Sequence, residues 1–484
     1  MPRIPAIPNF RIKNMQIGLF SVGLEEYWHQ FEGLHNRLLQ YHQYIRQRLE
    51  EIHGGVLDLG LVDTADKAFE AGKKLRTGDA DIIFLYVPTY ALSSTVLPVI
   101  RQHRAPVIIL NLTPGEAIGY QSFNQLGDRV QMTGEWLAHC GACPVPEIAN
   151  VFKRTGVRFH QVTGMLQEES CWNEIAAWVE AARVAHTMNN NRLGAMGHYY
   201  SGMLDIYSDL TLQYKYFGGH IELLEVDELS ALRREVTPQQ ADERIQEFQA
   251  AFDMQPDCDP AEIRKAAVTS VALDMLTAQY KLGSLAYYYK GTGIPENKDT
   301  ISSIIVGNSL LTARGIPVAG EYEIKNAQAM KIMDSFGCGG SFTEYYAVDY
   351  KDDVVLMGHD GPGHIGIAEG KIKVKPLRVY HGKVGKGLSV EMSVKHGPVT
   401  LLSVVENDRN ELFLLVAEGE SVAGPILEIG NTNSRYRFSC GAKAFMERWN
   451  SHGPAHHCAA GTGHIYHKLE KLAHILQMEI IKVC

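Results

Sequence analysis

Residues 15–112 alternate short apolar runs with longer amphipathic segments, and this alternation is the feature that most narrowly limits the fold. The apolar runs are MQIGLFSV at 15–22, VLDLGLV at 56–62, DIIFLYV at 81–87 and PVIILNL at 106–112. Residues 25–51 and 63–75, which lie between them, carry helical spacing. Strands that alternate with helices form parallel sheets, which helices cover on both faces. The first part of the chain is therefore predicted to be a doubly wound α/β domain.

The carboxyl ends of the strands are where such sheets bind ligands, and here they are the loops that begin near Val22, Val87 and Leu112. No GxGxxG motif follows any of these strands. A dinucleotide site is therefore not supported. The segment is expected to be a scaffold or to contribute sugar-binding loops.

A second α/β unit is predicted to begin near Arg192. Its strands are RLGAMGH and HIELLEV (220–226), with a helix around 205–214 between them. Residues 225–282 are then expected to form two or three helices, one of them capped by Asp259 ahead of Pro260.

Beyond Gly337 the sequence changes to short β-type runs separated by glycine, asparagine and aspartate, which predicts an antiparallel barrel or sandwich closed by a helix near 464–478. A chain of 484 residues is too long for one hydrophobic core. The prediction is two Rossmann-like or flavodoxin-like domains, at 1–188 and 189–337, followed by a β-rich, barrel-like domain at 338–484.

Charge and composition exclude several classes of partner. The net charge of -9 comes from interleaved acids and bases, and no basic stripe is present that would bind nucleic acid or an anionic membrane. The amino terminus lacks an apolar signal segment, and no later stretch is apolar for long enough to span a bilayer. We therefore expect a cytoplasmic protein whose eight cysteines are thiols, with Cys140 and Cys143 forming neither a redox pair nor a zinc site.

Two glutamates and a set of histidines lie in glycine-rich surroundings in the second half of the chain. Glu321 and Glu344 flank a predicted helix at 324–336, and His359 follows an apolar strand. The segment HGPAHHCAAGTGH holds four histidines, at positions 452, 456, 457 and 464. Glycine-rich loops of this kind are typical of ligand sites. Carboxylate and imidazole together suit Mn²⁺ or a related first-row divalent cation.

Each of these residues also has an ordinary structural interpretation. A glutamate beside a helix start commonly interacts with the helix dipole, and this is the interpretation favoured for Glu323. A single histidine is more often hydrogen-bonded in a structural role than bound to a metal. The combination in glycine-rich loops of one half of the chain nevertheless favours a metal site.

The same residues resemble a known family, the L-arabinose isomerases and the related L-fucose isomerases. The resemblance includes AGE followed by a lysine (Glu321, Lys325), GGSFTEYY around Glu344, VLMGH ending at His359, and AHH at 455–457. Weaker similarity lies upstream at 123–128, 162–183 and 209–219. The resemblance thus extends over most of the chain, with its specific motifs between 318 and 457.

The resemblance implies an aldose–ketose isomerase with two α/β domains and a β-rich domain, assembled as a homohexamer with active sites between neighbouring subunits. It implies a divalent cation, usually Mn²⁺, held by Glu321, Glu344, His359 and His457, with His456 as a substrate contact. Moving a carbonyl between C1 and C2 requires an acid and a base acting through an enediol, and the two glutamates would serve in these roles. The substrate is expected to be a pentose, a hexose or a deoxysugar.

Three departures from the family pattern leave the sugar undecided. Asp128 or a neighbour stands where the family has a histidine, and VGLEEYW (22–28) replaces the family's Gly-Ser-Gln-His loop. DGPGH follows His359 and places His364 in a segment expected to lie beside the metal. A metal-dependent hydrolase or lyase with the same ligands, and a sugar-binding protein without catalysis, are the alternative functions.

Overall fold

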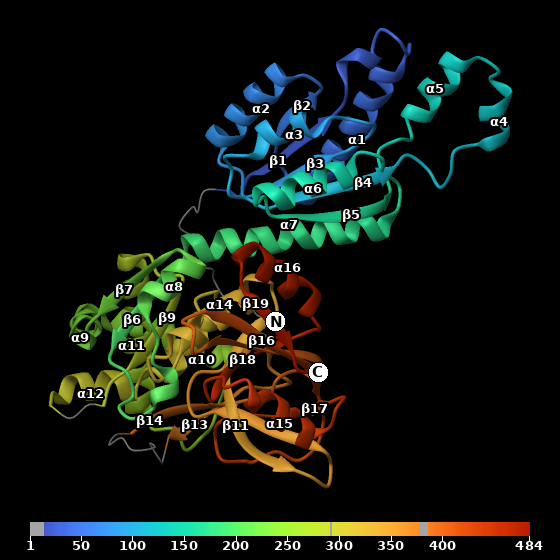
Figure 1. Cartoon of the computed structure of the whole chain (residues 1–484). Coiled ribbons are helices and arrows are strands. Elements are labelled where there is room, and N and C mark those ends of the chain that lie inside the picture. Colours follow the sequence, from blue (N-terminus) through green and yellow to red (C-terminus); the bar gives the residue numbers. More distant parts are fainter. Residues whose placement is uncertain (1–13, 291–292, 378–385) are drawn as a thin grey trace. The chain divides into compact units, whose positions relative to one another are not determined.

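The computed structural model describes residues 14–290, 293–377 and 386–484, which divide into two compact units (Figure 1). The first unit ends at His186 and the second begins at Thr187, so the boundary lies inside helix α7 (Glu169–Asn190). The domain boundaries at 188 and 337 remain predictions.

The first unit is built on a five-stranded parallel sheet in the order β2-β1-β3-β4-β5. Its strands are β1 (Ile17–Val22), β2 (Val56–Val62), β3 (Ile82–Tyr86), β4 (Val107–Thr113) and β5 (Phe159–Met165). Its other helices are α1 (Leu34–His53), α2 (Ala65–Gly78), α3 (Ser93–Ile100), α4 (Tyr120–Gln125), α5 (Arg129–Leu137) and α6 (Val145–Thr155). This strand order is the flavodoxin-like one, and the predicted α/β class is confirmed.

Alternating side chains of the central strands pack toward opposite faces of this sheet. Phe20, Ile83 and Leu85 join a core with residues of α2, α3 and α6, while α1 contacts β1 and β2. Within α1, His42 accepts or donates hydrogen bonds at both ring nitrogens, with Ser21 Oγ at 2.6 Å and Asp58 Oδ1 at 2.9 Å. The side chain of Ser21 is fully buried, so this Ser-His-Asp relay ties the helix to two strands and cannot meet a substrate.

Two predicted helices have different limits in the structure. Instead of running from 25 to 51, the first is a short 3-10 turn (Glu25–Tyr27) followed by α1, because Gly33 takes a φ of 81° directly before Leu34. The helix expected at 205–214 is a 3-10 turn (Leu204–Ile206) followed by α8 (Leu210–Phe217). Asp209 starts this second helix, since its carboxylate accepts from the Thr211 and Leu212 backbone N–H groups.

The second unit begins with a smaller parallel sheet in the order β10-β9-β6-β7. Its strands are β6 (Arg192–Gly197), β7 (His220–Leu224), β9 (Ser284–Tyr288) and β10 (Val318–Ala319). The helices around it are α8, α9 (Val226–Glu235), α10 (Pro238–Ala251), α11 (Pro260–Tyr280), α12 (Pro295–Ser302), α13 (Ile305–Ala313) and α14 (Ile324–Ser335). Asp259 caps α11 as predicted, by accepting from the Ala261 N–H.

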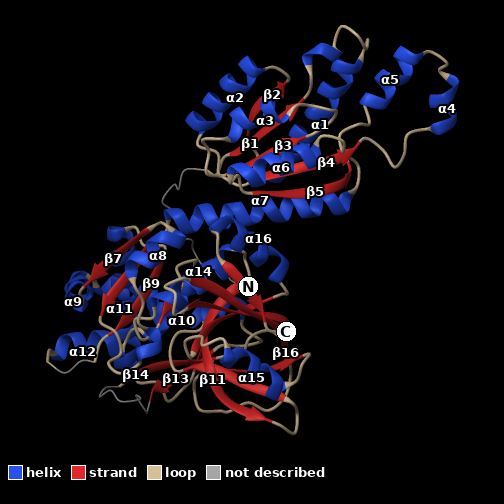
Figure 2. Cartoon of the chain, viewed as in Figure 1, coloured by secondary structure: helices blue, strands red, loops and turns tan. Residues whose placement is uncertain are grey.

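A closed antiparallel barrel of six strands completes the second unit, so the barrel-like prediction is confirmed (Figure 2). The strand order is β15-β18-β11-β12-β17-β16, and β15 also pairs with β16 to close the ring. The strands are β11 (Gly339–Asp349), β12 (Val354–His359), β15 (Gly397–Glu406), β16 (Leu412–Ser421), β17 (Thr432–Phe438) and β18 (His457–Thr462), with β19 (Glu479–Lys482) added in parallel to β16. Closure leaves no free edge among these six strands.

Smaller elements complete the second unit. Helices α15 (Ala442–Ser451) and α16 (Tyr466–Leu476) follow in the chain, and a 3-10 turn spans Ile365–Ile367. A three-stranded sheet joins β8 (Asp253–Met254), β13 (Lys373–Leu377) and β14 (Gly387–Glu391). All eight cysteines are free thiols, as expected from the sequence. Among the described residues, no helix combines the length and the apolar character that crossing a bilayer requires.

Candidate metal centre

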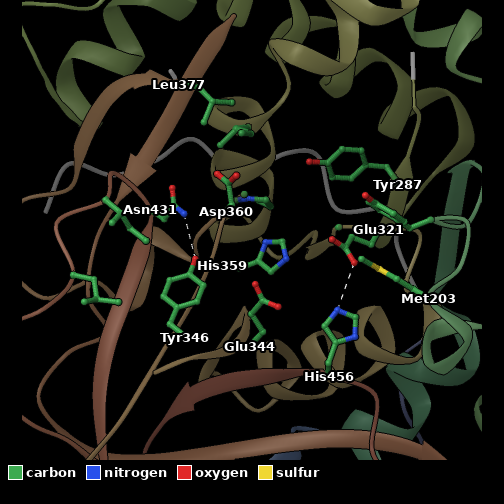
Figure 3. Close-up of a pocket in the computed structure, with 17 residues that line it drawn as sticks. Met203, Tyr287, Glu321, Glu344, Tyr346, His359, Asp360, Leu377, Asn431 and His456 are labelled. Carbon is green, nitrogen blue, oxygen red and sulfur yellow. Dashed lines mark hydrogen bonds and ion pairs between the residues drawn. The ribbon is translucent and has the colours of Figure 1, made fainter. Parts of the chain in front are cut away.

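The candidate site lies where the carboxyl ends of three parallel strands meet the outer surface of the barrel. Tyr200 and Met203 follow β6, Tyr287 is near the end of β9, and Glu321 follows β10. Together with barrel residues they line a cavity of about 460 Å³ (Figure 3). The second sheet thus follows the rule that α/β sheets bind ligands beyond the carboxyl ends of their strands.

Glu321 reaches this cavity from a strained turn. Glu321 and Tyr322 have φ values of 58° and 64°, in the left-handed region that side chains other than glycine rarely occupy. Hydrogen bonds hold the turn, because the Tyr322 N–H donates to the Tyr287 carbonyl at 3.0 Å and the Glu323 N–H donates to the Gly320 carbonyl at 3.0 Å. A Cβ at Gly320 would come within 3.3 Å of the Phe342 ring, so glycine permits the close approach of this turn to β11.

The barrel supplies Glu344 and His457 as cross-strand neighbours. Glu344 pairs with His457 on one side and with Gly358 on the other, and His359 follows Gly358 at the end of β12. Cys458 and Ala460 point into the barrel core, so the alternation of β18 turns His457 outward. The Phe342 ring packs against both imidazoles, with ring centroids 4.4 Å from His359 and 4.3 Å from His457.

These side chains form two overlapping groups that share His457. Glu344, His359 and His457 can each offer one ligand atom within 4.8 Å of the others, and so can Glu321, His456 and His457. Figure 3 shows Glu321, Glu344, His359 and His456 directed toward one region of the cavity. The structure therefore brings together the five residues that the resemblance implies as metal ligands or substrate contact, which are Glu321, Glu344, His359, His456 and His457.

One observation tests whether this donor set suits a cation. Nε2 of His457 and Oε2 of Glu321 are buried and 3.6 Å apart, and neither has a hydrogen-bond partner among the described residues. Buried polar atoms are normally satisfied, so a facing pair of unsatisfied acceptors calls for a further group between them. A carboxylate–imidazole set of this kind fits a divalent first-row cation.

Glu323 belongs to the site, although the sequence favoured for it an interaction with the dipole of the following helix. It stands at the N-cap position of α14, but its side chain does not cap the helix and instead hydrogen-bonds Nδ1 of His457. Burial raises the pKa of Glu323 and lowers the pKa of His457. When Nδ1 of His457 donates to the Glu323 carboxylate, the lone pair of Nε2 faces Glu321.

Charge around Glu321 favours its ionised form. Burial raises the pKa of this carboxyl, but His456, His457 and His359 outweigh burial and hold the pKa below its ordinary value. Burial likewise lowers the pKa of His456, whereas Glu321 and Asp205 raise it to about 9. At neutral pH the cavity thus contains an ionised carboxylate beside an imidazolium.

Further polar groups complete the wall of the cavity. Asp360 and Tyr287 line it, and the Asn431 side chain donates to the Tyr346 hydroxyl at 3.4 Å. His364 does not line the cavity, contrary to the sequence-based expectation, because its Nε2 faces Asp334 of α14 at 3.9 Å. Asp128, in the first unit, caps α5 by accepting from the Val130 and Gln131 N–H groups.

Comparison with known proteins agrees with this architecture. The fold and the site together define a protein with parallel α/β sheets and a β-barrel that carries a carboxylate–histidine cluster. Residues 339–479 match the model of the L-arabinose isomerase C-terminal domain, and this segment contains Glu344, His359, His456 and His457. An L-arabinose isomerase from a Nocardioides species is 23% identical over 354 residues, covering 70% of this chain and 68% of that protein. These two matches confirm the resemblance to the L-arabinose isomerases.

Proposed function

We propose that this protein is a divalent-metal-dependent aldose–ketose isomerase, acting on a pentose, a hexose or a deoxysugar. The observation that carries the proposal is the pair of carboxylates, Glu321 and Glu344, which line one cavity with His359 and each belong to a possible ligand group with His457. The relationship to the arabinose isomerases supports the choice of isomerisation over other reactions of a metal site. A sugar-binding protein without catalysis would have no need of two acid/base carboxylates around a metal.

In this proposal Glu321, Glu344, His359 and His457 hold the cation, with Mn²⁺ as the expected ion. When bound, the cation would polarise the substrate carbonyl and stabilise negative charge on its oxygens. Glu323 orients His457 through its Nδ1, and the Phe342 ring supports both imidazoles. We also propose a cytoplasmic homo-oligomer, a hexamer, which light scattering on the purified protein would test.

The two glutamates are proposed as the acid/base pair. Isomerisation removes a proton from one of the two adjacent carbons and returns a proton to the other, through an enediol. The ionised state of Glu321 at neutral pH suits it to accept a proton or to hold the cation. His456, as an imidazolium, would donate a hydrogen bond to a substrate oxygen at the mouth of the cavity.

The test is to incubate the Mn²⁺-loaded chain with aldopentoses, aldohexoses and 6-deoxyhexoses in D₂O and to follow the products by NMR. The expected result is ketose formation that stops with a chelator, with solvent deuterium entering at C1 or C2. Glu321→Gln and Glu344→Gln should each lower turnover by about 10²–10⁴-fold. Glu447→Gln is the matched control, because this side chain is 69% exposed on α15.

Three outcomes would contradict the proposal. Cleavage of a substrate without ketose formation would replace isomerisation by hydrolysis or elimination. Near-normal turnover of either Gln variant would remove that glutamate from the acid/base pair. Sugar binding without any turnover would assign the chain to the non-catalytic binding proteins.

A further inference from the structure

Asp205 does not line the cavity, but it hydrogen-bonds His456, which does. Its carboxylate accepts two hydrogen bonds from His456, one from the backbone N–H at 3.0 Å and one from Nδ1 at 2.6 Å. The two residues are 251 positions apart in the sequence. This contact joins the segment after β6 to the segment before β18, and both belong to the second unit.

The His456 ring is fixed by contacts on three sides. Nδ1 is held by Asp205, the ring packs against the tilted His457 ring with centroids 3.8 Å apart, and Nε2 lies 3.6 Å from Glu321 Oε2. Only the contact with Asp205 has the length of a hydrogen bond. Figure 3 shows the remaining ring nitrogen directed at Glu321.

Holding this ring has an energetic reason. The His456 side chain is 36% exposed, so packing alone leaves it room to rotate. A charge-assisted hydrogen bond to a carboxylate is among the stronger ones and fixes both ring plane and direction. The second bond, from the His456 backbone, fixes the same carboxylate relative to the strand that begins at His457.

The position of Asp205 is itself secured independently of its side chain. Lys325 Nζ donates to the Asp205 backbone carbonyl at 2.6 Å, and the tilted rings of Tyr199 and Tyr207 pack together with centroids 4.9 Å apart. Removing the carboxylate therefore leaves the course of the 198–209 segment in place. This makes the side chain open to test by substitution.

We propose that Asp205 is a positioning residue, which holds His456 so that Nε2 enters the cavity beside Glu321. This inference rests on the proposed function, in which His456 contacts the substrate. Asp205 acts through His456 and not through the four residues proposed to hold the cation. Its loss should therefore lower turnover and leave cation binding unchanged.

The kinetic test is a double-mutant cycle. Asp205→Ala should lower kcat by about 10–100-fold, the scale expected when a reacting group is misplaced by about 1 Å. Asp205→Asn keeps an acceptor oxygen and should recover most of the lost turnover. The double variant Asp205→Ala/His456→Ala should be no slower than His456→Ala alone, because both substitutions remove the same interaction, the one between Asp205 and His456. Asp408→Ala, an exposed aspartate in a turn, is the control.

Measurements that do not depend on turnover separate this inference from the proposed function. Crystal structures should show the imidazole displaced from its place beside Glu321 in Asp205→Ala and retained in Asp205→Asn. Bound Mn²⁺ and the thermal midpoint should equal those of the wild type in both variants. If the wild type forms no ketose, the proposed function fails, and the ring positions still decide whether Asp205 holds His456.

Three results would overturn the inference. An imidazole that stays beside Glu321 in Asp205→Ala would show that packing on His457 suffices. Additive losses in the double-mutant cycle, or loss of bound Mn²⁺ in Asp205→Ala, would show that Asp205 acts on the site by another route.

Discussion

Glu323 hydrogen-bonds Nδ1 of His457, and the opposite nitrogen of the same ring faces Glu321 Oε2 at 3.6 Å. The side chains of Glu323 and His457 are almost completely buried, at 1% and 0% exposure. A buried carboxylate behind a histidine is the arrangement that orients metal ligands in proteins. Glu321 and Glu323, which are two positions apart in the sequence, therefore have different roles: Glu321 faces Nε2 of His457, and Glu323 orients the ring through Nδ1.

Replacing Glu323 should weaken cation binding without removing a ligand. Glu323→Gln keeps an acceptor for Nδ1 and loses the charge, and an affinity for Mn²⁺ lower by about 10–100-fold is expected. Competition with a chromophoric chelator measures this affinity. Glu447→Gln provides the surface control, and an unchanged affinity in Glu323→Gln would mean that the hydrogen bond does not tune His457.

Removing divalent cations should lower the thermal stability of the protein. A ligand present at 100 times its dissociation constant stabilises the folded state by about 2.7 kcal/mol, which corresponds to a midpoint shift of about 3–4 °C for a protein of this size. Differential scanning fluorimetry with and without chelator measures the shift. His457→Ala should abolish the response to the chelator, whereas His396→Ala, whose side chain is 44% exposed, should retain it.

The Ser21–His42–Asp58 relay should matter for stability and not for turnover. His42→Leu removes both hydrogen bonds and leaves the buried Ser21 hydroxyl without its partner, at a cost of about 2–4 kcal/mol. Urea unfolding monitored by tryptophan fluorescence measures this cost. Gln43→Leu, at an exposed position of the same helix, should cost much less. A turnover lost in Ser21→Ala, with folding intact, would contradict the structural role.

Glu391 should make stability depend on pH. Burial raises the pKa of this carboxyl, but ion pairs with Lys375 at 2.6 Å and Lys373 at 3.3 Å outweigh burial and lower the pKa below its ordinary value. A carboxyl with a lowered folded pKa contributes stability above its unfolded pKa of about 4.3, and this stability is lost as the pH falls through the folded value.

The corresponding measurement compares the wild type with Glu391→Gln in urea at several pH values. At pH 7 the variant should be less stable by about 1–3 kcal/mol, and the difference should shrink between pH 5 and pH 3. Glu420→Gln, at an exposed position, should follow the wild type throughout. A difference that stays constant with pH would attribute the loss to packing rather than to charge.

The sequence predicted the α/β part of the fold where strands are buried on both faces. β1, β3 and β4 are apolar almost throughout, which is why they could be recognised without a structure. β5 was not recognised, because its sequence FHQVTGM contains His160, Gln161 and Thr163 and so lacks the apolar run that revealed β2, the other edge strand. The barrel could be predicted only as a choice between a barrel and a sandwich, since the closing pair β15–β16 is invisible in local pattern.

The candidate site was predictable where glycine-rich segments contain isolated acids and histidines. Glu321, Glu344 and His359 stood out for this reason. Asp205 and Glu323 did not, because their roles arise from partners 251 and 134 residues away. The prediction that His364 lies beside the metal was wrong. His364 is close to His359 in the sequence, but its side chain faces Asp334 and not the cavity.

The rung formed by Glu344 with His457 and Gly358 has a consequence for how the protein can change. A slip of one residue in either strand pair would turn Glu344 to the other face of the barrel. The register of the closed barrel therefore couples the positions of Glu344, His457 and Gly358. The segments that end the cavity, around Met203, Leu377 and Ile429, lie outside this rung and can be exchanged separately. Changes in these loops would alter the walls of the cavity, while the register of the three strands keeps Glu344 and His457 in place.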